Sequence, residues 1–334
     1  MVRGTPAGIV DELVHSATGS STKAIMVAIV EKGKLVFSKG YGDSGSGTPD
    51  LNTVFYIGSL SKAVTGYGLM KLVDQGKVAL RKEVGTYVPN LPESWAKIPL
   101  LNYVTHTSGI PGVGAKASSF QNAVDNAANK PIFFEAGSDQ KYNNFNFAIA
   151  GQVIEHVSGK SYLDYMTDNV FGPIGMSSTG VGITKNLVSV PNYPDVAKYG
   201  TPSGGLESSA GDLVRWFQYM YNQEGMSPHG YRLMYTPLVP THPSGKEAWN
   251  FTPGWQARFA SGDEIVAKDG GVVGFFSMMQ MVPDKGVCVI LLEAHAGVGK
   301  TGTHLWPLAA NILRDVYGYA KPAAGSNIEV ETGE

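Results

Sequence analysis

Cysteine is almost absent from this chain of 334 residues, and the single Cys288 excludes an intramolecular disulfide or a zinc site built from several cysteines. It lies in an apolar run at 287–292 and is expected to be a buried strand residue. Charge is also sparse: 16% of the residues are charged, the formal net charge is −2, and no basic run occurs. We therefore expect no nucleic-acid partner. No apolar segment approaches the roughly 18 residues of a membrane span, so none is expected.

Three familiar signatures are missing as well. The seven histidines show no ligand pattern such as His-Glu-x-x-His, so neither a metal nor a cofactor is expected. Residues 1–6 lack the apolar segment of a signal peptide, which predicts a cytoplasmic chain or the trimmed form of an exported one. Gly-x-Ser-x-Gly does not occur, which disfavours the nucleophile elbow of α/β-hydrolases. A Ser-His-Asp triad assembled only in space stays open.

Strand patterns occur at both ends of the chain, with a long helical segment between them. The expected strands are 24–30, 34–38, 255–260, 264–268, 273–282 and 287–292, with turns at Glu31-Lys32-Gly33 and at Gly270-Gly271. The clearest expected helices are 7–16, 59–76, 146–157 and 305–317. Early and late strands can share one sheet only if the chain ends come together.

These patterns predict an α/β (α+β) fold, in which both chain ends build an antiparallel sheet with flanking terminal helices. An all-helical lobe is inserted in the middle. We assign 1–58 and 220–320 to the sheet lobe and 59–219 to the mainly helical lobe. The polar residues 321–334 are expected to be a mobile tail.

Ser59 and Lys62 form a Ser-x-x-Lys pair at the N-cap or first turn of the predicted helix 59–76. A serine hydroxyl is a weak nucleophile until a neighbour takes its proton, which a buried lysine can do. The N–H groups and the positive dipole end of a helix N-terminus favour an oxyanion beside that serine. The alternative is a chance pattern at a helix start.

Tyr142-Asn143-Asn144 precedes the predicted helix 146–157. The Tyr142 phenol can shuttle a proton near a cation, and the Asn144 amide can hydrogen bond a substrate carbonyl. A plain asparagine cap with a packed tyrosine is the alternative.

Lys268-Asp269-Gly270-Gly271 lies at the end of the predicted strand 264–268, before the predicted strand 273–282. Its glycines let a substrate lie against the strand edge, Gly271 N–H can donate to an oxyanion, and Lys268 can attract a carboxylate. The alternative is a glycine-rich turn with a surface lysine.

The segment 294–301 fits a loose phosphate-loop pattern, but it begins with Ala294. Only about 30 residues follow it, too few for a nucleotide-binding domain. Lys300-Thr301-Gly302 also spells a serine-hydrolase motif but lacks the strands expected after it.

Together, these motifs resemble the serine β-lactamase and penicillin-binding-protein superfamily, in particular its class C-like branch. That branch holds DD-carboxypeptidases, D-aminopeptidases, class C β-lactamases and related carboxylesterases. The resemblance spans about Ala24 to Tyr317. Its flanking segments are Tyr103-Val104-Thr105-His106-Thr107-Ser108-Gly109-Ile110, Gly172-Pro173-Ile174-Gly175-Met176, and Ser203-Gly204-Gly205-Leu206 with Asp212-Leu213.

The resemblance implies a β-lactamase/transpeptidase-like fold and a serine hydrolase that uses an acyl-enzyme. Ser59 would be the nucleophile, and Lys62 and Tyr142 would share the proton transfers. The resemblance also implies that Asn144, Lys268 and Gly270 bind substrate and that the backbone N–H groups of Ser59 and Gly271 form the oxyanion hole. The expected partner is a small ester, peptide or β-lactam.

Departures from the family pattern affect the expected substrate. Asp269 stands where Thr or Ser is usual, so it offers no hydroxyl to a substrate carboxylate and can pair with Lys268. Glu135-Ala136-Gly137 replaces the usual Pro-Gly, and no class A-type Glu-x-x-x-Asn segment is recognisable. A non-catalytic binding or regulatory member of the same fold is the alternative interpretation.

Overall fold

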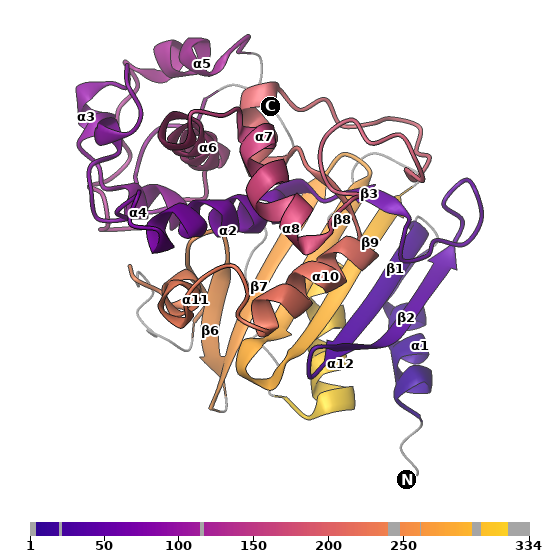
Figure 1. Ribbon diagram of the computed structural model, residues 1–334. Coiled ribbons are helices and arrows are strands. Elements are labelled where there is room, and N and C mark those ends of the chain that lie inside the picture. Colours follow the sequence, from indigo (N-terminus) through magenta and orange to yellow (C-terminus); the bar gives the residue numbers. More distant parts are fainter. Residues whose placement is uncertain are drawn as a thin grey trace.

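The computed structural model describes residues 5–19, 22–113, 117–239, 248–260, 262–295 and 302–319. A large sheet supports one side of the molecule, and most helices gather on the other (Figure 1). The helices are α1 (Pro6–Ala17), α2 (Ser61–Asp74), α3 (Glu93–Ala96), α4 (Leu100–Val104), α5 (Phe120–Ala127), α6 (Asn144–Ser158), α7 (Tyr162–Met166), α8 (Gly172–Ile174), α9 (Thr201–Gly204), α10 (Ala210–Tyr221), α11 (Pro228–Tyr235) and α12 (Leu305–Tyr317).

The main sheet has seven antiparallel strands and joins the two ends of the chain. Its spatial order is β2 (Lys34–Gly42), β1 (Thr22–Glu31), β9 (Val287–His295), β8 (Phe275–Val282), β7 (Asp263–Val272), β6 (Gln256–Ala260) and β5 (Asn250–Phe251). Strand β1 pairs with β9, with Met26 opposite Leu292. This pairing confirms the predicted sheet built from both chain ends. Strands β3 (Val54–Tyr56) and β4 (Glu207–Ser209) form a separate pair.

The predicted first hairpin is present between β1 and β2. Its turn residues Lys32 and Gly33 have φ angles of 50° and 72°, the left-handed values that a tight two-residue turn requires.

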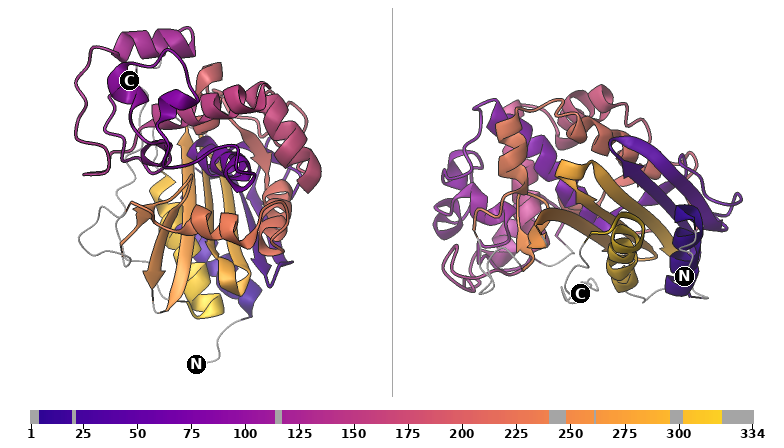
Figure 2. Two further views of the ribbon diagram at one scale, coloured as in Figure 1. Left: turned by 60° about the vertical axis from the view of Figure 1, so that its left-hand side comes forward. Right: turned by 90° about the horizontal axis from the view of Figure 1, so that it is seen from below.

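Both faces of the sheet are covered, which explains why its central strands are nearly continuous apolar runs. On one face Ile25 and Val27 pack with Val10 of α1 and Leu308 of α12. Figure 2 shows these two terminal helices together on that side of the sheet. On the other face lies the larger core, into which Met26 points with α2 and α6 residues.

The predicted turn at Gly270-Gly271 is wrong. Strand β7 continues through both glycines to Val272, and the chain turns at Val273 and Gly274 before β8. Glycine is needed here because the backbone of β7 lies very close to the backbone at Ile57, not because the chain turns. A Cβ on Gly270 would lie 2.0 Å from the Ile57 carbonyl oxygen.

The predicted lobe boundary near residue 220 falls inside α10, close to its C-terminal end. This helix packs against β1 and β9, so it covers the sheet, although its residues belong to the segment predicted as the helical lobe. The division into lobes stays a prediction. The predicted tail 321–334 and most of the phosphate-loop-like segment, residues 296–301, lie outside the described residues.

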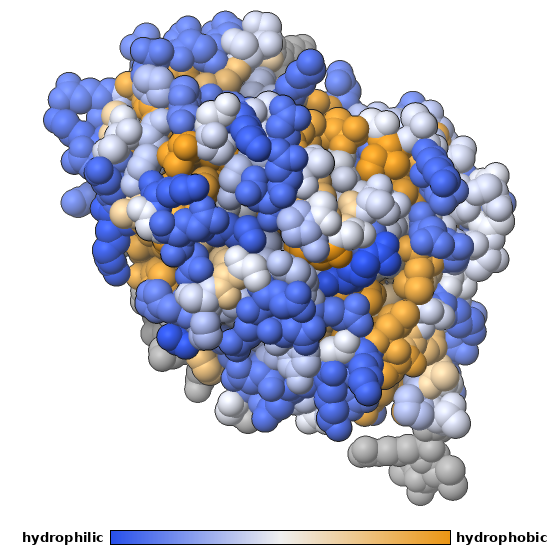
Figure 3. Space-filling view, viewed as in Figure 1, coloured by the Kyte–Doolittle hydropathy of each residue, from blue (hydrophilic) through white to orange (hydrophobic). Residues whose placement is uncertain are grey.

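The face drawn in Figure 3 is mostly hydrophilic, with several smaller hydrophobic areas. Across the described ranges, no helix has both the length and the hydrophobicity that crossing a membrane requires.

Candidate active site

Ser59 lies in a short 3-10 helix, η1 (Gly58–Leu60), that runs directly into α2. The serine is therefore one turn before the α-helix, within the region predicted for it. Helix α2 is buried from Ser61 through Leu72. Such a helix is a rigid support, because no part of that segment faces solvent. Ser59 itself is only partly buried and so remains accessible.

Two glycines allow η1 to lie against strand β7. Gly58 has a φ angle of 48°, and a Cβ on it would lie 2.7 Å from the Gly271 nitrogen. On the other side of this contact, the Ser277 hydroxyl donates to the Ile57 carbonyl at 2.7 Å. A side chain at Gly58 or Gly270 would therefore separate Ser59 from β7.

The Lys62 side chain is fully buried and reaches back to Ser59. Its Nζ lies 3.0 Å from Ser59 Oγ, 2.5 Å from Asn144 Oδ1 and 2.8 Å from the Ser203 carbonyl oxygen. An ammonium group has three N–H donors, and these contacts supply three acceptors. The surroundings thus fit a charged lysine.

Tyr142 and Asn144 come from the start of α6. Asn143 caps this helix by accepting a hydrogen bond from the Phe145 N–H at 2.9 Å, which fixes the residues on either side. The helix begins at Asn144, two residues before the predicted start. A 2.7 Å hydrogen bond joins Tyr142 OH and Ser59 Oγ. The sequence-predicted residues Ser59, Lys62, Tyr142 and Asn144 therefore lie within one hydrogen-bonded group.

The His106 ring packs against the Tyr142 ring. The two ring centroids are 4.4 Å apart, and His106 Nδ1 accepts the Asn143 N–H at 3.2 Å. Burial, together with the positive charges of Lys62 and Lys268, holds the pKa of His106 well below its usual range. In the sequence, His106 stands out only as part of a flanking segment, with no predicted role of its own. Its φ of 55° is a signal found only in the structure.

Lys268 and Asp269 lie on β7 beside this group. Lys268 is 3% exposed, its Nζ is 5.5 Å from the centroid of the Tyr142 ring, and Lys62 Nζ is 4.6 Å from the same centroid. Lys268 Nζ also lies 3.1 Å from Asp269 Oδ1, so the two side chains form an ion pair. On β7, the next two residues differ in exposure: Gly270 is buried, and Gly271 is exposed. All the sequence-predicted site residues thus lie around Ser59 or on the strand that contacts η1.

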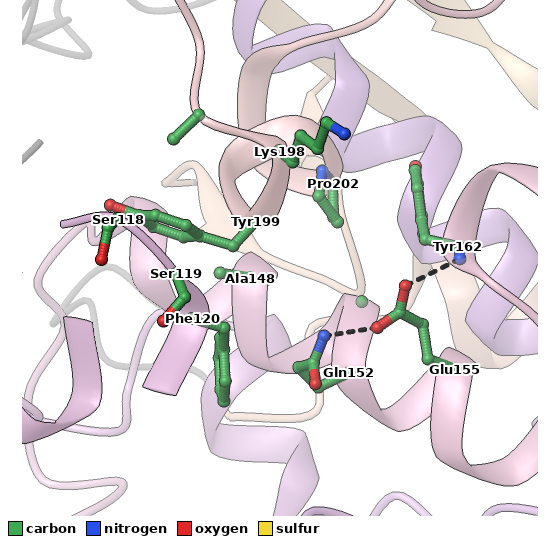
Figure 4. Close-up of a pocket in the computed structure, with 12 residues that line it drawn as sticks. Ser118, Ser119, Phe120, Ala148, Gln152, Glu155, Tyr162, Lys198, Tyr199 and Pro202 are labelled. Atoms are coloured by element: carbon green, nitrogen blue, oxygen red, sulfur yellow. Dashed lines mark hydrogen bonds between the residues drawn. The ribbon is translucent and has the colours of Figure 1, made fainter. Parts of the chain in front are cut away.

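A separate cavity of about 430 Å³ lies within the helical elements (Figure 4). It is lined by residues of α5, α6, α7 and α9, among them Phe120, Gln152 and Tyr162. The Glu155 carboxylate accepts hydrogen bonds from Gln152 and from the Tyr162 N–H, so it is already paired within the cavity wall. The Ser59 group is the better catalytic candidate.

Residues 9–314 match the Beta-lactamase family model. The chain belongs to this family. This match confirms the predicted resemblance to the serine β-lactamase and penicillin-binding-protein superfamily. The chain is similar to AmpH of Escherichia coli K12, a D-alanyl-D-alanine-carboxypeptidase/endopeptidase, with 27% identity over 319 residues, 82% of this chain and 80% of AmpH.

Two solved structures share the fold of this β-lactamase-family chain. One is an octameric penicillin-binding protein homologue from Pyrococcus abyssi, with a TM-score of 0.80, 22% identity, and coverage of 95% of this chain and 78% of the homologue. The other is a class C beta-lactamase, with a TM-score of 0.82, 19% identity, and coverage of 94% and 97%. These matches confirm the predicted β-lactamase/transpeptidase fold.

Proposed function

We propose that this protein is a serine hydrolase that cleaves small esters or amides through an acyl-enzyme on Ser59. The observation that supports it most is the placement of Ser59 Oγ 3.0 Å from Lys62 Nζ and 2.7 Å from Tyr142 OH. A partly exposed serine with two proton-transfer groups in contact has the geometry of an activated nucleophile.

In the first step, Ser59 Oγ attacks the substrate carbonyl carbon and loses its proton to Tyr142 in the phenolate form. Lys62, with three acceptors around its ammonium, stays charged and orients Ser59. Lys62 and Lys268 both place positive charge near the Tyr142 ring, which favours the phenolate.

The tetrahedral oxygen is assigned to the backbone N–H groups of Ser59 and Gly271, since η1 and β7 are in contact at Gly58. Collapse of this intermediate breaks the bond to the leaving alcohol or amine, which takes the proton from Tyr142. A water molecule then attacks the carbonyl carbon of the Ser59 ester, with Tyr142 accepting its proton. As the bond to Ser59 Oγ breaks, Tyr142 returns that proton to Oγ, so the acid product leaves and both the serine hydroxyl and the phenolate are restored.

The substrate class is proposed to be a small ester, peptide or β-lactam. Asn144 and Gly270 are assigned to the acyl side, and Lys268 to a substrate carboxylate. Asp269 weakens that last attraction because it already pairs with Lys268 at 3.1 Å. AmpH is a carboxypeptidase, and its similarity favours peptide bonds among these choices.

The rival function is a binding or regulatory protein that keeps the fold without turnover. A rate panel on p-nitrophenyl esters, nitrocefin and D-amino-acid amides separates the two. We expect hydrolysis of at least one substrate, and a loss of kcat of about 10³-fold or more in Ser59→Ala. Ser118→Ala, which changes an exposed serine of the separate cavity, is the matched control and should retain full activity. No turnover of any of the three substrates would favour the rival.

A further inference from the structure

A second cluster of reactive side chains lies on the opposite face of the sheet from Ser59. It consists of Glu293 and His295 at the end of β9 and His304 at the end of η7 (Gly302–His304), the short turn before α12. Glu293 stands opposite Phe276 and Ile25 in the sheet register, and both of these belong to the core under α1 and α12. The proposed hydrolase chemistry makes no use of this cluster.

The three side chains converge on one point. Their candidate ligand atoms all lie within 4.8 Å of one another. His295 Nε2 is 3.1 Å from Glu293 Oε1, and His304 Nε2 is 2.7 Å from Glu293 Oε2. The Glu293 side chain is fully buried, His295 is 4% exposed, and His304 is 24% exposed, so the cluster is closed on the sheet side and reachable from the His304 side.

The contact between Glu293 and His295 is close, but its geometry is not that of an aligned N–H···O hydrogen bond. Within the described ranges, neither ring nitrogen of His295 has a hydrogen-bond partner, even though Nε2 is only 3.1 Å from the carboxylate. A buried polar atom without a hydrogen-bond partner is unfavourable. Two side chains that bind the same cation bring their ligand atoms close together without pointing an N–H at each other, as His295 Nε2 and Glu293 Oε1 do here. A purely hydrogen-bonded triad would have aimed an N–H of His295 at the carboxylate.

Charge leads to the same conclusion. Among the described residues, the partners that the structure gives the buried Glu293 carboxylate are the two histidines and the Thr22 hydroxyl, which donates to Oε1 at 2.6 Å. No lysine or arginine ion pair to Glu293 occurs in that part of the chain. A buried carboxylate needs a compensating positive charge, which a cation bound between the two imidazoles and the carboxylate would supply.

We propose that Glu293, His295 and His304 form a binding site for a divalent transition-metal ion of the Zn²⁺ type. Two imidazoles and one carboxylate are a known zinc ligand set, with a water molecule in the fourth position. Ligand atoms of a tetrahedral zinc site with bonds of about 2.0–2.1 Å are about 3.3 Å apart, close to the two contacts already present. The Thr22 hydroxyl orients the carboxylate as an outer partner.

A metal ion here ties the end of β9 to the turn that begins α12. Because its ligands are assembled only in the folded chain, bound metal stabilises that state. The site therefore serves stability of the terminal-helix face and is independent of turnover at Ser59.

The test is equilibrium dialysis of untagged protein against Zn²⁺, with metal content measured by mass spectrometry and Tm measured with and without the ion. We expect one Zn²⁺ per chain and a Tm rise of about 5 °C at a hundredfold excess over Kd. His304→Ala and the near-isosteric Glu293→Gln should lose both effects. His156→Ala, an exposed histidine of α6, is the matched control and should keep them.

Equal Zn²⁺ binding by the protein, by His304→Ala and by Glu293→Gln would overturn the proposal, as would no binding by the unaltered protein. If a variant fails to fold, the visible spectrum of the unaltered protein loaded with Co²⁺ tests whether the metal site exists. Tetrahedral d–d bands support the site, and a spectrum equal to that of free aqueous Co²⁺ contradicts it. Neither result depends on Ser59 activity, so this test and that of the proposed hydrolase succeed or fail separately.

Discussion

Lys62 has no solvent exposure, yet its amine reaches three oxygen atoms from three parts of the chain. Burial alone disfavours a charged amine, and hydrogen bonds to three acceptors favour it. At this residue the hydrogen bonds match the full donor capacity of the ammonium. In the proposed mechanism the work is therefore divided, with Lys62 orienting Ser59 and Tyr142 transferring the proton.

Tyr142→Phe tests this division. Removal of the hydroxyl should lower kcat by about 10²–10⁴-fold, the usual contribution of a general acid–base group, with little change in Tm. Steady-state kinetics on the best substrate measure it. Tyr199→Phe in the separate cavity is the control and should leave kcat unchanged. Full activity in Tyr142→Phe would assign the proton transfer to Lys62.

Asp269→Asn tests the ion pair with Lys268. The substitution keeps the shape and removes the negative charge, so the Lys268 ammonium becomes more available to a substrate carboxylate. We expect KM for anionic substrates to fall, because the largely buried Lys268 ammonium then lacks its paired carboxylate. KM for neutral p-nitrophenyl esters should stay the same. An equal change for both substrate types would show that the pair does not select for charge.

At the scale of elements, the site depends on how closely η1 approaches β7. Gly270→Ala would place a methyl carbon 2.0 Å from the Ile57 carbonyl oxygen, so η1 and Ser59 must move. Overpacking of this kind costs about 1–3 kcal/mol. We expect a lower Tm together with a loss of kcat of more than about 10²-fold, because small displacements of reacting groups are costly.

Gly112→Ala is the control for that substitution, because a Cβ there meets nothing within 4 Å. It should leave both kcat and Tm near their original values. Unchanged kinetics in Gly270→Ala would mean that η1 tolerates displacement from β7.

The elements themselves were largely predictable because their signals are local. Helix α12 was predicted with the residues that the structure shows, since its apolar stripe repeats every three to four positions. The pairing of Ser59 with Lys62 was also visible, because the two residues are only three positions apart in the sequence. The role of the Ser203 carbonyl was not visible, because it lies 141 residues from Lys62 and any residue can supply a carbonyl.

Two further failures have physical causes. Gly270 was assigned to a turn because glycine marks both turns and close backbone approaches, and the sequence does not separate them. The Glu293, His295 and His304 cluster follows no motif spacing, so its convergence depends on how β9 and α12 pack.

For the whole molecule, buried His106 links stability to pH. Its pKa is lowered well below the ordinary 6.5 by burial first and then by Lys62 and Lys268. The unfolded chain therefore binds a proton at a higher pH than the folded chain. Stability is fully present above about pH 6.5 and falls as the pH decreases below it, by up to about 1.4 kcal/mol per pH unit from this residue.

Urea unfolding between pH 5 and pH 7 measures this effect. In His106→Gln, the decrease in unfolding free energy toward pH 5 should be smaller than in the unaltered protein, because one titrating group is gone. His229→Ala, an exposed histidine, is the control and should retain the original pH dependence. Identical pH dependence in His106→Gln would contradict a neutral, buried His106.

The proposed function depends above all on Ser59 being the nucleophile. The most direct measurement is reaction with a fluorophosphonate or a labelled penicillin, followed by mass spectrometry of the intact chain and of its peptides. We expect a single adduct on the peptide that contains Ser59 and no adduct in folded Ser59→Ala. An adduct on any other peptide, or equal labelling of the alanine variant, would contradict it.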